Sequence, residues 1–125
     1  MIVSVGVDAV AIGRIEDLLE RSGERFEQRV FTPEEVTYCR GRPRPAESFA
    51  ARFAAKEAAL KCLGSGWAEG AGFRQVEVVR LPSGGTELTL HGPAAERARQ
   101  RGIRRWHVSL THTETTATAF VVAED

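Results

Sequence analysis

The sequence contains no apolar run long enough to cross a bilayer and no excess of either charge. Its 17 Lys and Arg residues balance 17 Asp and Glu residues, so the formal net charge is zero. A chain without a basic field is a poor candidate for a general nucleic-acid-binding protein, and one without a long apolar run has no membrane-spanning helix. We expect neither nucleic acid nor a membrane among its partners, and charge has to be interpreted locally.

Cysteine is also scarce, because Cys39 and Cys62 are the only two in the chain. No histidine lies near either cysteine in the sequence, so the pattern does not indicate a zinc site. The N-terminus lacks a basic region before its apolar residues, and we therefore expect no secretion signal. Together these features predict reduced thiols, no disulfide framework and a cytoplasmic location.

The stretch from Arg52 to Gly66 (RFAAKEAALKCLGSG) is the feature around which the chain is organised. Large apolar residues recur on one line of a helical wheel, and small residues cover most of the rest, which is typical of a buried helix. We take the 125 residues as one domain, 1–125. A domain of this size has a small core, so we expect neighbouring subunits of an oligomer to help bury the apolar helix. The large apolar residues are Phe49, Phe53, Leu60 and Leu63.

The charged residues of this helix fall on two faces, Glu57 with Lys61 and Arg52 with Lys56. Two cations one turn apart repel each other, and an anion bound between Arg52 and Lys56 would remove that repulsion. Glu57, beside Lys61, could then hold a metal ion next to this anion. Alternatively, the cations extend along the apolar surface to water, and Glu57 forms an ordinary ion pair with Lys61. The helix alone slightly favours the second interpretation.

The first segment, Ile2 to Val7, alternates and is rich in β-branched residues, which predicts a strand that ends at Asp8. A carboxylate at the end of a buried strand is a common position for a ligand or catalytic group. It is equally suited to capping the helix that follows. The sequence leaves these two roles of Asp8 in balance.

A helical pattern follows from Ile12 to about Phe26. One of its faces is cationic with a single leucine, which suits an acidic amphipathic helix of a partner protein, although most such faces are simply solvated. A helix break at Ser22-Gly23 would put the last of these residues out of register. The face comprises Arg14, Leu18, Arg21 and Arg25.

The next helix is predicted to begin with Thr32 as cap, Pro33 at its first position and Glu35 as the reciprocal capping-box acid, and to run to about Arg40. Prolines then prevent the loop 41–45 from being helical, and this loop offers Arg42 or Arg44 to an anion site.

The second half of the chain reads as a hairpin, a short helix and two more strands. The central helix ends at Leu63 with Gly64 as its natural C-cap, and a glycine-rich loop follows that has neither a P-loop nor a dinucleotide-binding pattern. His112 stands next to a turn, where a surface role is the simplest interpretation. The predicted ranges are strands 73–81, 86–91, 104–111 and 116–123, the last of them central, and helix 94–101.

Three segments together resemble the small bacterial holo-acyl-carrier-protein synthases, a class of 4′-phosphopantetheinyl transferases. The similarity covers nearly the whole chain, and its most specific part is the motif FAAKEA with Lys61 and Gly-Ser-Gly. The segments are Gly6 to Asp8 with Ile12, Arg14 and Ile15; Arg52 to Gly66; and Ser109 to Thr113 with Ala117, Ala119 and Phe120.

This resemblance implies an α+β fold, with an antiparallel sheet packed around a long buried helix, assembled as a homotrimer with coenzyme A between adjacent subunits. It implies transfer of phosphopantetheine from coenzyme A to a serine of an apo-acyl carrier protein, releasing adenosine 3′,5′-bisphosphate. The alternative is a non-catalytic module of the same fold that binds a carrier protein or a nucleotide. Whether fatty-acid, polyketide or peptide carriers are used is not encoded in these motifs.

By the same resemblance, Asp8 and Glu57 match the carboxylates that hold Mg²⁺, and Lys61 is placed to bind the same phosphates. The proton of the carrier serine would go to Glu57 or to a water held by the metal. The cationic face 14–25 corresponds to the carrier-docking helix. Contacts to coenzyme A are implied for Arg44, Arg52, Lys56, Lys61, Gly64, His112 and Thr113.

Overall fold

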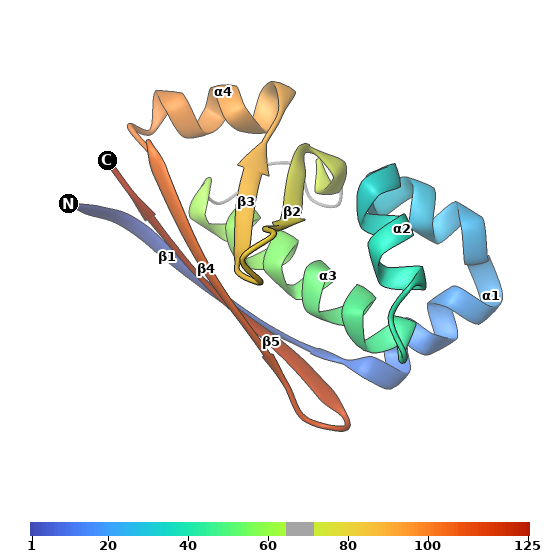
Figure 1. Cartoon of the computed structure of the whole chain (residues 1–125). Coiled ribbons are helices and arrows are strands. Elements are labelled where there is room, and N and C mark those ends of the chain that lie inside the picture. Colours follow the sequence, from blue (N-terminus) through green and yellow to red (C-terminus); the bar gives the residue numbers. More distant parts are fainter. Residues whose placement is uncertain (65–71) are drawn as a thin grey trace.

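The computed structural model describes residues 1–64 and 72–125 and shows a mixed helical and antiparallel architecture (Figure 1). The glycine-rich loop predicted after Gly64 falls mostly on residues 65–71, which lie outside the described residues. No helix in the described part has the length and apolar character to cross a membrane. The elements are β1 (Ile2–Ala11), α1 (Ile12–Val30), α2 (Pro33–Arg40), α3 (Pro45–Cys62), a 3₁₀ turn (Phe73–Gln75), β2 (Val76–Arg80), β3 (Thr86–Leu90), α4 (Gly92–Gln100), β4 (Arg105–His112) and β5 (Thr116–Glu124).

The architecture is built on α3, which lies against a three-stranded antiparallel sheet with the strand order β1-β5-β4. The β2-β3 hairpin packs on α3 as well, and α1 and α2 cover the first part of α3. This arrangement confirms the α+β fold, the buried central helix and the central position of the last strand.

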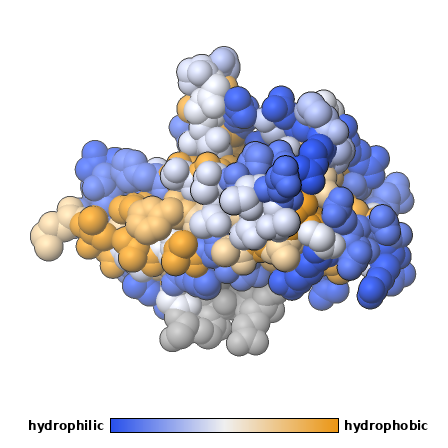
Figure 2. Space-filling view, turned by 90° about the horizontal axis from the view of Figure 1, so that it is seen from below, coloured by the Kyte–Doolittle hydropathy of each residue, from blue (hydrophilic) through white to orange (hydrophobic). Residues whose placement is uncertain are grey.

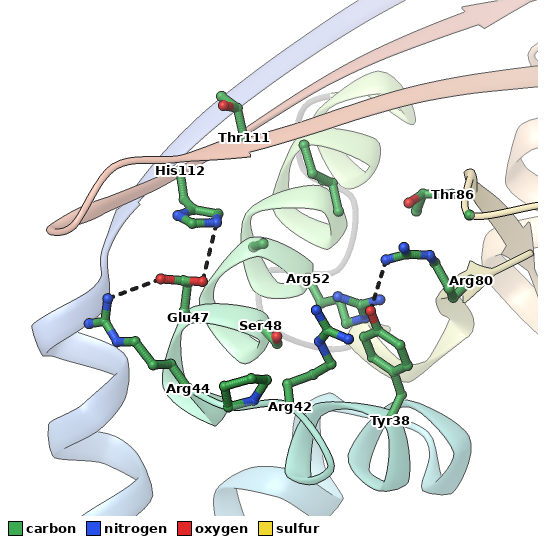
Figure 3. Close-up of a pocket in the computed structure, with 14 residues that line it drawn as sticks. Tyr38, Arg42, Arg44, Glu47, Ser48, Arg52, Arg80, Thr86, Thr111 and His112 are labelled. Carbon is green, nitrogen blue, oxygen red and sulfur yellow. Dashed lines mark hydrogen bonds and ion pairs between the residues drawn. The ribbon is translucent and has the colours of Figure 1, made fainter.

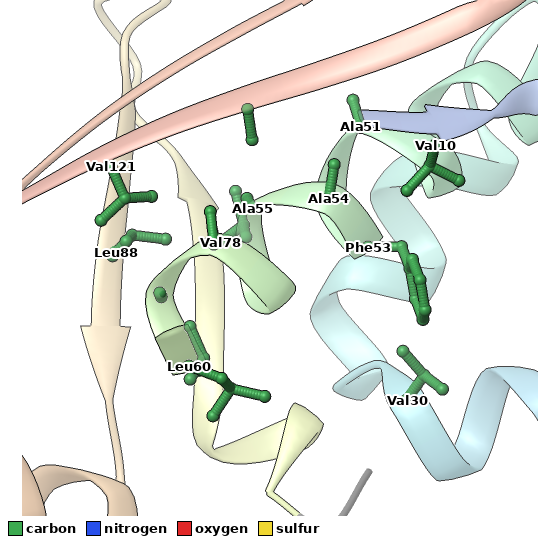
Figure 4. Packing of buried hydrophobic residues seen from close by; sticks show 14 of the residues in the cluster. Val10, Val30, Ala51, Phe53, Ala54, Ala55, Leu60, Val78, Leu88 and Val121 are labelled. Atoms are coloured by element: carbon green, nitrogen blue, oxygen red, sulfur yellow. The ribbon is translucent and has the colours of Figure 1, made fainter. Parts of the chain in front are cut away.

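Small side chains on both surfaces let α3 approach the sheet closely. Every second residue of β5 from Ala117 to Ala123 is buried, and the alanines of α3 between positions 50 and 59 are buried as well (Figure 4). Larger groups such as Phe53, Leu60 and Val78 fill the space on the other sides of the helix. The core is therefore tight along the helix–sheet contact, where there is little room for added atoms.

Gly6 marks the closest approach of β1 to α3. A Cβ atom at this position would lie 2.1 Å from the carbonyl oxygen of Ala58, a distance that no real contact tolerates. This carbonyl oxygen is part of the α3 backbone and cannot rotate away, so any larger residue at position 6 would push β1 and α3 apart. Gly6 thus sets the spacing between the two elements that carry Asp8 and Glu57.

Several boundaries differ from those predicted from the sequence. β1 continues to Ala11, so Asp8 lies within the strand and not at its end, and the cap position of α1 is Ala11, without a side-chain hydrogen bond. Asp8 is therefore not a helix cap. α1 reaches Val30, but Gly23 has φ 38° and ψ −114°, which breaks the helix where the Ser22-Gly23 pair predicted a break.

Other local predictions are confirmed. The capping box of α2 is present in full, since the Thr32 hydroxyl accepts from the Glu35 amide and the Glu35 carboxylate accepts from the Thr32 amide. The two cysteines are buried and unpaired, and burial raises the pKa of the Cys39 thiol to about 12. Such a thiol carries almost no thiolate at neutral pH.

We predict that Gly6→Ala lowers the free energy of unfolding by about 1–3 kcal/mol, because overpacking forces β1 away from α3. Urea unfolding followed by circular dichroism measures this change. Gly13→Ala is the matched control, since a Cβ there meets nothing within 4 Å and Gly13 lies in a helix, where alanine is preferred. Equal effects of the two substitutions would contradict the role of Gly6.

Candidate functional site

Asp8, Glu57 and Lys61 come together where β1 crosses the second half of α3. The Lys61 ammonium donates to the Val7 carbonyl at 2.9 Å and lies 3.3 Å from an Asp8 carboxylate oxygen. Burial raises the pKa of Glu57, the Asp8 charge raises it further, and Lys61 and Arg14 act in the opposite direction. The structure therefore groups two carboxylates with two cations.

Two neighbouring carboxylates repel each other, and a divalent cation between them would relieve that repulsion. Within residues 1–64 and 72–125, no three His, Cys, Asp or Glu side chains are grouped as a metal site. Two carboxylates cannot form a complete protein cage, but they suit Mg²⁺, which usually retains waters and takes phosphate oxygens as further ligands. Asp8 and Glu57 thus fit a magnesium ion that shares its coordination with a substrate.

A second polar site is a cavity of about 450 Å³ on another side of α3 (Figure 3). It lies between the α2–α3 loop, the first turns of α3, the β2-β3 hairpin and the end of β4. Its charged lining is mainly cationic, which makes it suitable for an anion with several negative charges. The charged residues that line it are Arg42, Arg44, Glu47, Arg52, Arg80 and His112.

Arg52 is the most buried of these cations, with 5% of its surface exposed. Its Nε atom is buried and has no hydrogen-bond partner among the described residues. An unsatisfied buried donor is costly, and an anion in the cavity would remove that cost. The Arg52 guanidinium lies over the ring of Tyr38, 4.2 Å from its centroid.

Arg44 and His112 are linked through Glu47. The Arg44 guanidinium donates to Glu47 at 3.1 Å, and the other Glu47 oxygen lies 3.2 Å from His112 Nε2 (Figure 3). His112 Nδ1 faces the Thr113 carbonyl at 3.3 Å. Both ring nitrogens therefore face oxygen acceptors.

Lys56, in contrast, does not face the cavity. Its side chain is fully buried, and its ammonium donates to the Glu35 carboxylate at 2.7 Å, to the Phe73 carbonyl at 3.0 Å and to the Val76 carbonyl at 2.6 Å. An ammonium has three donors, so none is left for a phosphate. The expectation that Lys56 binds coenzyme A is corrected: Lys56 holds α3 to α2 and β2.

The sequence pattern does not predict that Glu35 pairs with Lys56. Glu35 was interpreted only as the capping-box acid of α2, yet its carboxylate also accepts from the Val78 amide at 2.7 Å. Burial lowers the pKa of Lys56, and the Glu35 charge and hydrogen bond oppose that shift. Both oxygens of the Glu35 carboxylate therefore accept hydrogen bonds, one from Lys56 and the Thr32 amide and the other from the Val78 amide.

Gly64 and Thr113 lie outside the lining of the cavity. Gly64 follows the end of α3 with φ 104°, and a Cβ there would meet the Arg101 guanidinium at 2.5 Å. The Thr113 hydroxyl accepts from the amides of Thr115 and Thr116 and so shapes the β4–β5 turn. Both residues have local structural roles, and their predicted contacts with coenzyme A stay predictions.

The cationic face of α1 is only partly continuous. Arg14, Leu18 and Arg21 line one shallow hollow together with Asp17. Arg25 follows the break at Gly23 and does not line this hollow, so the structure separates it from the other three residues of the predicted docking face. Because Arg14 also influences Glu57, the docking face begins beside the carboxylate site.

The residues of the cavity that sequence reasoning missed include Tyr38, Glu47 and Arg80. Tyr38 and Glu47 lie on helices outside the recognised motifs, and Arg80 ends a strand whose alternation is unremarkable. Arg42 had been considered as part of the basic loop. No local pattern indicated that the hairpin would face the α2–α3 loop.

Comparison with known proteins is consistent along the whole chain. Residues 4–120 match the model of the 4′-phosphopantetheinyl transferase superfamily. A holo-[acyl-carrier-protein] synthase from Koribacter versatilis is 45% identical over 125 residues, covering 100% of both chains.

Solved structures give the same result. The holo-[acyl-carrier-protein] synthase from Neisseria meningitidis has a TM-score of 0.88 and 36% identity, with 100% of both chains covered. The synthase from Helicobacter pylori, solved in complex with coenzyme A, has a TM-score of 0.83 and 29% identity, covering 97% of this chain and 100% of that one.

We predict that Lys56→Met lowers the free energy of unfolding by about 3–5 kcal/mol, because it leaves the Glu35 charge buried without its partner. Denaturant titration measures the loss. Arg44→Met is the control, since it breaks a partly exposed pair with Glu47 and should cost less than about 1 kcal/mol. A loss at Lys56 no larger than that at Arg44 would show that the buried pair is not needed for the fold.

Proposed function

This chain belongs to the 4′-phosphopantetheinyl transferase superfamily, and we propose that it transfers the 4′-phosphopantetheine group of coenzyme A to a serine of an apo-acyl carrier protein. The products are the holo-carrier protein and adenosine 3′,5′-bisphosphate. The observation that carries this proposal is the grouping of Asp8, Glu57 and Lys61, in a chain that matches holo-[acyl-carrier-protein] synthases over its full length.

Asp8 and Glu57 would hold the magnesium ion, and Lys61 would bind the pyrophosphate beside it. Magnesium bound there would neutralise the charge that develops on the pyrophosphate as the serine attacks the β-phosphoryl group. Lys61 is well suited to bind the pyrophosphate, because its side chain is about half exposed. Its ammonium is held beside the carboxylate site by Val7 and Asp8.

Glu57 is the group we propose to accept the serine proton. Its carboxylate is partly withdrawn from water and faces the same site as Asp8 and Lys61, so an oxygen not taken by the metal would be available to that proton. In the reaction, the serine oxygen forms a bond to phosphorus, the bond to the bisphosphate leaving group breaks, and the serine proton passes to Glu57. Asp8, which lies 3.3 Å from the Lys61 ammonium, would serve as the second metal carboxylate.

The cationic cavity would bind the remaining phosphates of coenzyme A, including its 3′-phosphate, through Arg44, Arg52 and His112. Residues 8, 57 and 61 are absent from the lining of this cavity, and Asp8 belongs to the edge strand β1 whereas His112 belongs to β4 at the opposite edge. We therefore propose that each active site combines the carboxylates of one subunit with the cavity of its neighbour.

The outer face of the sheet supports such an assembly, proposed here as a homotrimer. Figure 2 shows apolar side chains gathered on this face. Val7 is paired with Phe120 across β1 and β5, and 54% and 48% of these residues are exposed, with Val5 and Ile2 further along β1. A patch of this kind on an isolated subunit is expected to be covered by another chain.

Acyl carrier proteins are the proposed macromolecular partners, and a cytoplasmic location agrees with the unpaired thiols of Cys39 and Cys62. The cations Arg14 and Arg21, with Leu18 between them, form a surface that suits an acidic helix with an apolar residue. Docking there would bring the carrier serine to the carboxylate site, because Arg14 is close enough to Glu57 to influence its pKa.

The transfer itself is tested by incubating the protein with coenzyme A, MgCl₂ and an apo-acyl carrier protein and measuring the carrier by mass spectrometry. We expect the gain of one phosphopantetheine, lost when EDTA replaces MgCl₂. Glu57→Gln should reduce the rate at least about 100-fold, because an amide can neither accept the proton nor replace a metal carboxylate. A folded protein that binds coenzyme A without any mass gain would instead be the non-catalytic module.

Stability provides the control for this variant. Because the pKa of Glu57 is raised in the folded protein, its ionised form is disfavoured by folding. Without magnesium, Glu57→Gln should therefore raise the free energy of unfolding at pH 7 slightly, by less than about 1 kcal/mol after solvent screening. This difference in stability between Glu57→Gln and the wild type should vanish as the pH falls below the ordinary pKa of glutamate, about 4.3. A loss of stability would mean that misfolding explains the lost activity.

We predict that charge reversal at Arg14 and Arg21 raises the KM for the carrier protein at least about tenfold, because like charges then meet at the docking face. The KM for coenzyme A should not change. Arg25→Glu is the matched control, and its effect should be below about threefold because this residue lies beyond the break at Gly23. Equal effects of all three reversals would indicate attraction by total charge only.

A further inference from the structure

The ring of Tyr38 is surrounded by three guanidinium groups. The central carbon of Arg52 lies 4.2 Å from the ring centroid, that of Arg42 5.6 Å and that of Arg80 5.9 Å. The Tyr38 hydroxyl also accepts a hydrogen bond from Arg80 Nη1 at 2.8 Å (Figure 3). These three arginines come from α3, from the α2–α3 loop and from the end of β2, so the ring is their common contact.

The described residues include no carboxylate that pairs with Arg42, Arg52 or Arg80. Arg44, on the other side of the same cavity, is paired with Glu47. A carboxylate would hold a guanidinium firmly but would also cancel its charge toward a ligand. The electron-rich face of an aromatic ring orients a guanidinium and leaves its net charge in place.

The position of the ring is itself fixed. Tyr38 lies in α2, whose start is held by the capping box and by the salt bridge between Glu35 and Lys56. Cys39, the next residue, is fully buried. The ring is therefore a stable platform rather than a mobile surface group, and the Nε donor of Arg52 above it remains without a partner in the described part of the chain.

We propose that Tyr38 is a positioning residue that holds Arg42, Arg52 and Arg80 ready for a phosphate monoester dianion. This inference rests on the proposed function, in which the cavity takes the 3′-phosphate of coenzyme A. The ring then contributes to selectivity for the 3′-phosphorylated nucleotide without touching the reacting atoms. Its loss would spread the three guanidinium groups by mutual repulsion and return them to water.

Calorimetry with the full protein tests this inference without relying on transfer. The ligands are adenosine 3′,5′-bisphosphate and adenosine 5′-monophosphate, which differ only in the 3′-phosphate. We expect Tyr38→Leu to weaken binding of the bisphosphate about 5- to 30-fold, the size of a partly desolvated cation–π contact, and to leave the monophosphate nearly unaffected. Tyr38→Phe, which keeps the ring, should restore most of the affinity lost with leucine.

Equal losses for the two nucleotides would overturn the inference, because the effect would not involve the 3′-phosphate. Tyr38→Phe as weak as Tyr38→Leu would overturn it as well, since the hydroxyl and not the ring would then be responsible. A wild-type protein that binds both nucleotides equally would show that the cavity does not select the 3′-phosphate. If the wild type binds the bisphosphate but transfers nothing, the proposed function fails, and the comparison of variants still decides the role of Tyr38.

Discussion

The salt bridge between Lys56 and Glu35 is the interaction on which the arrangement of this protein depends. α3 is apolar nearly all round, so hydrophobic packing alone would tolerate several rotations about its axis. A fully buried ammonium with three specific acceptors permits only one. With Lys56 fixed, the next residue, Glu57, faces β1. Arg52, one helical turn before Lys56, faces Tyr38.

The same helix thus serves two sites by two different electrostatic means. At the carboxylate site, Asp8 and Lys61 are paired, which leaves Glu57 with a raised pKa and a site that suits a cation and a proton. At the cavity, Arg52 is held against an aromatic ring and keeps its charge for an anion. The two sites thereby lie on separate faces of one element.

Much of the carboxylate site was predictable because its determinants are local. The pattern FAAKEAALK places Glu57 and Lys61 on one face of a helix, and the resemblance joins Asp8 to them. Arg52 and Lys56 show where this reasoning stops. Their repulsion is relieved by Glu35, 21 residues before Lys56, and by Tyr38, neither of which any spacing within the helix reveals.

The sequence by itself determined most of the elements, their order and the buried character of α3. These follow from periodicity, capping and short-range spacing, which act between neighbours in the chain. Only the tertiary structure decided that Lys56 is internal, that Gly6 sets the distance from β1 to α3, and that Tyr38 gathers three arginines. Those outcomes depend on which surfaces meet when distant segments pack, and packing is a property of the whole chain.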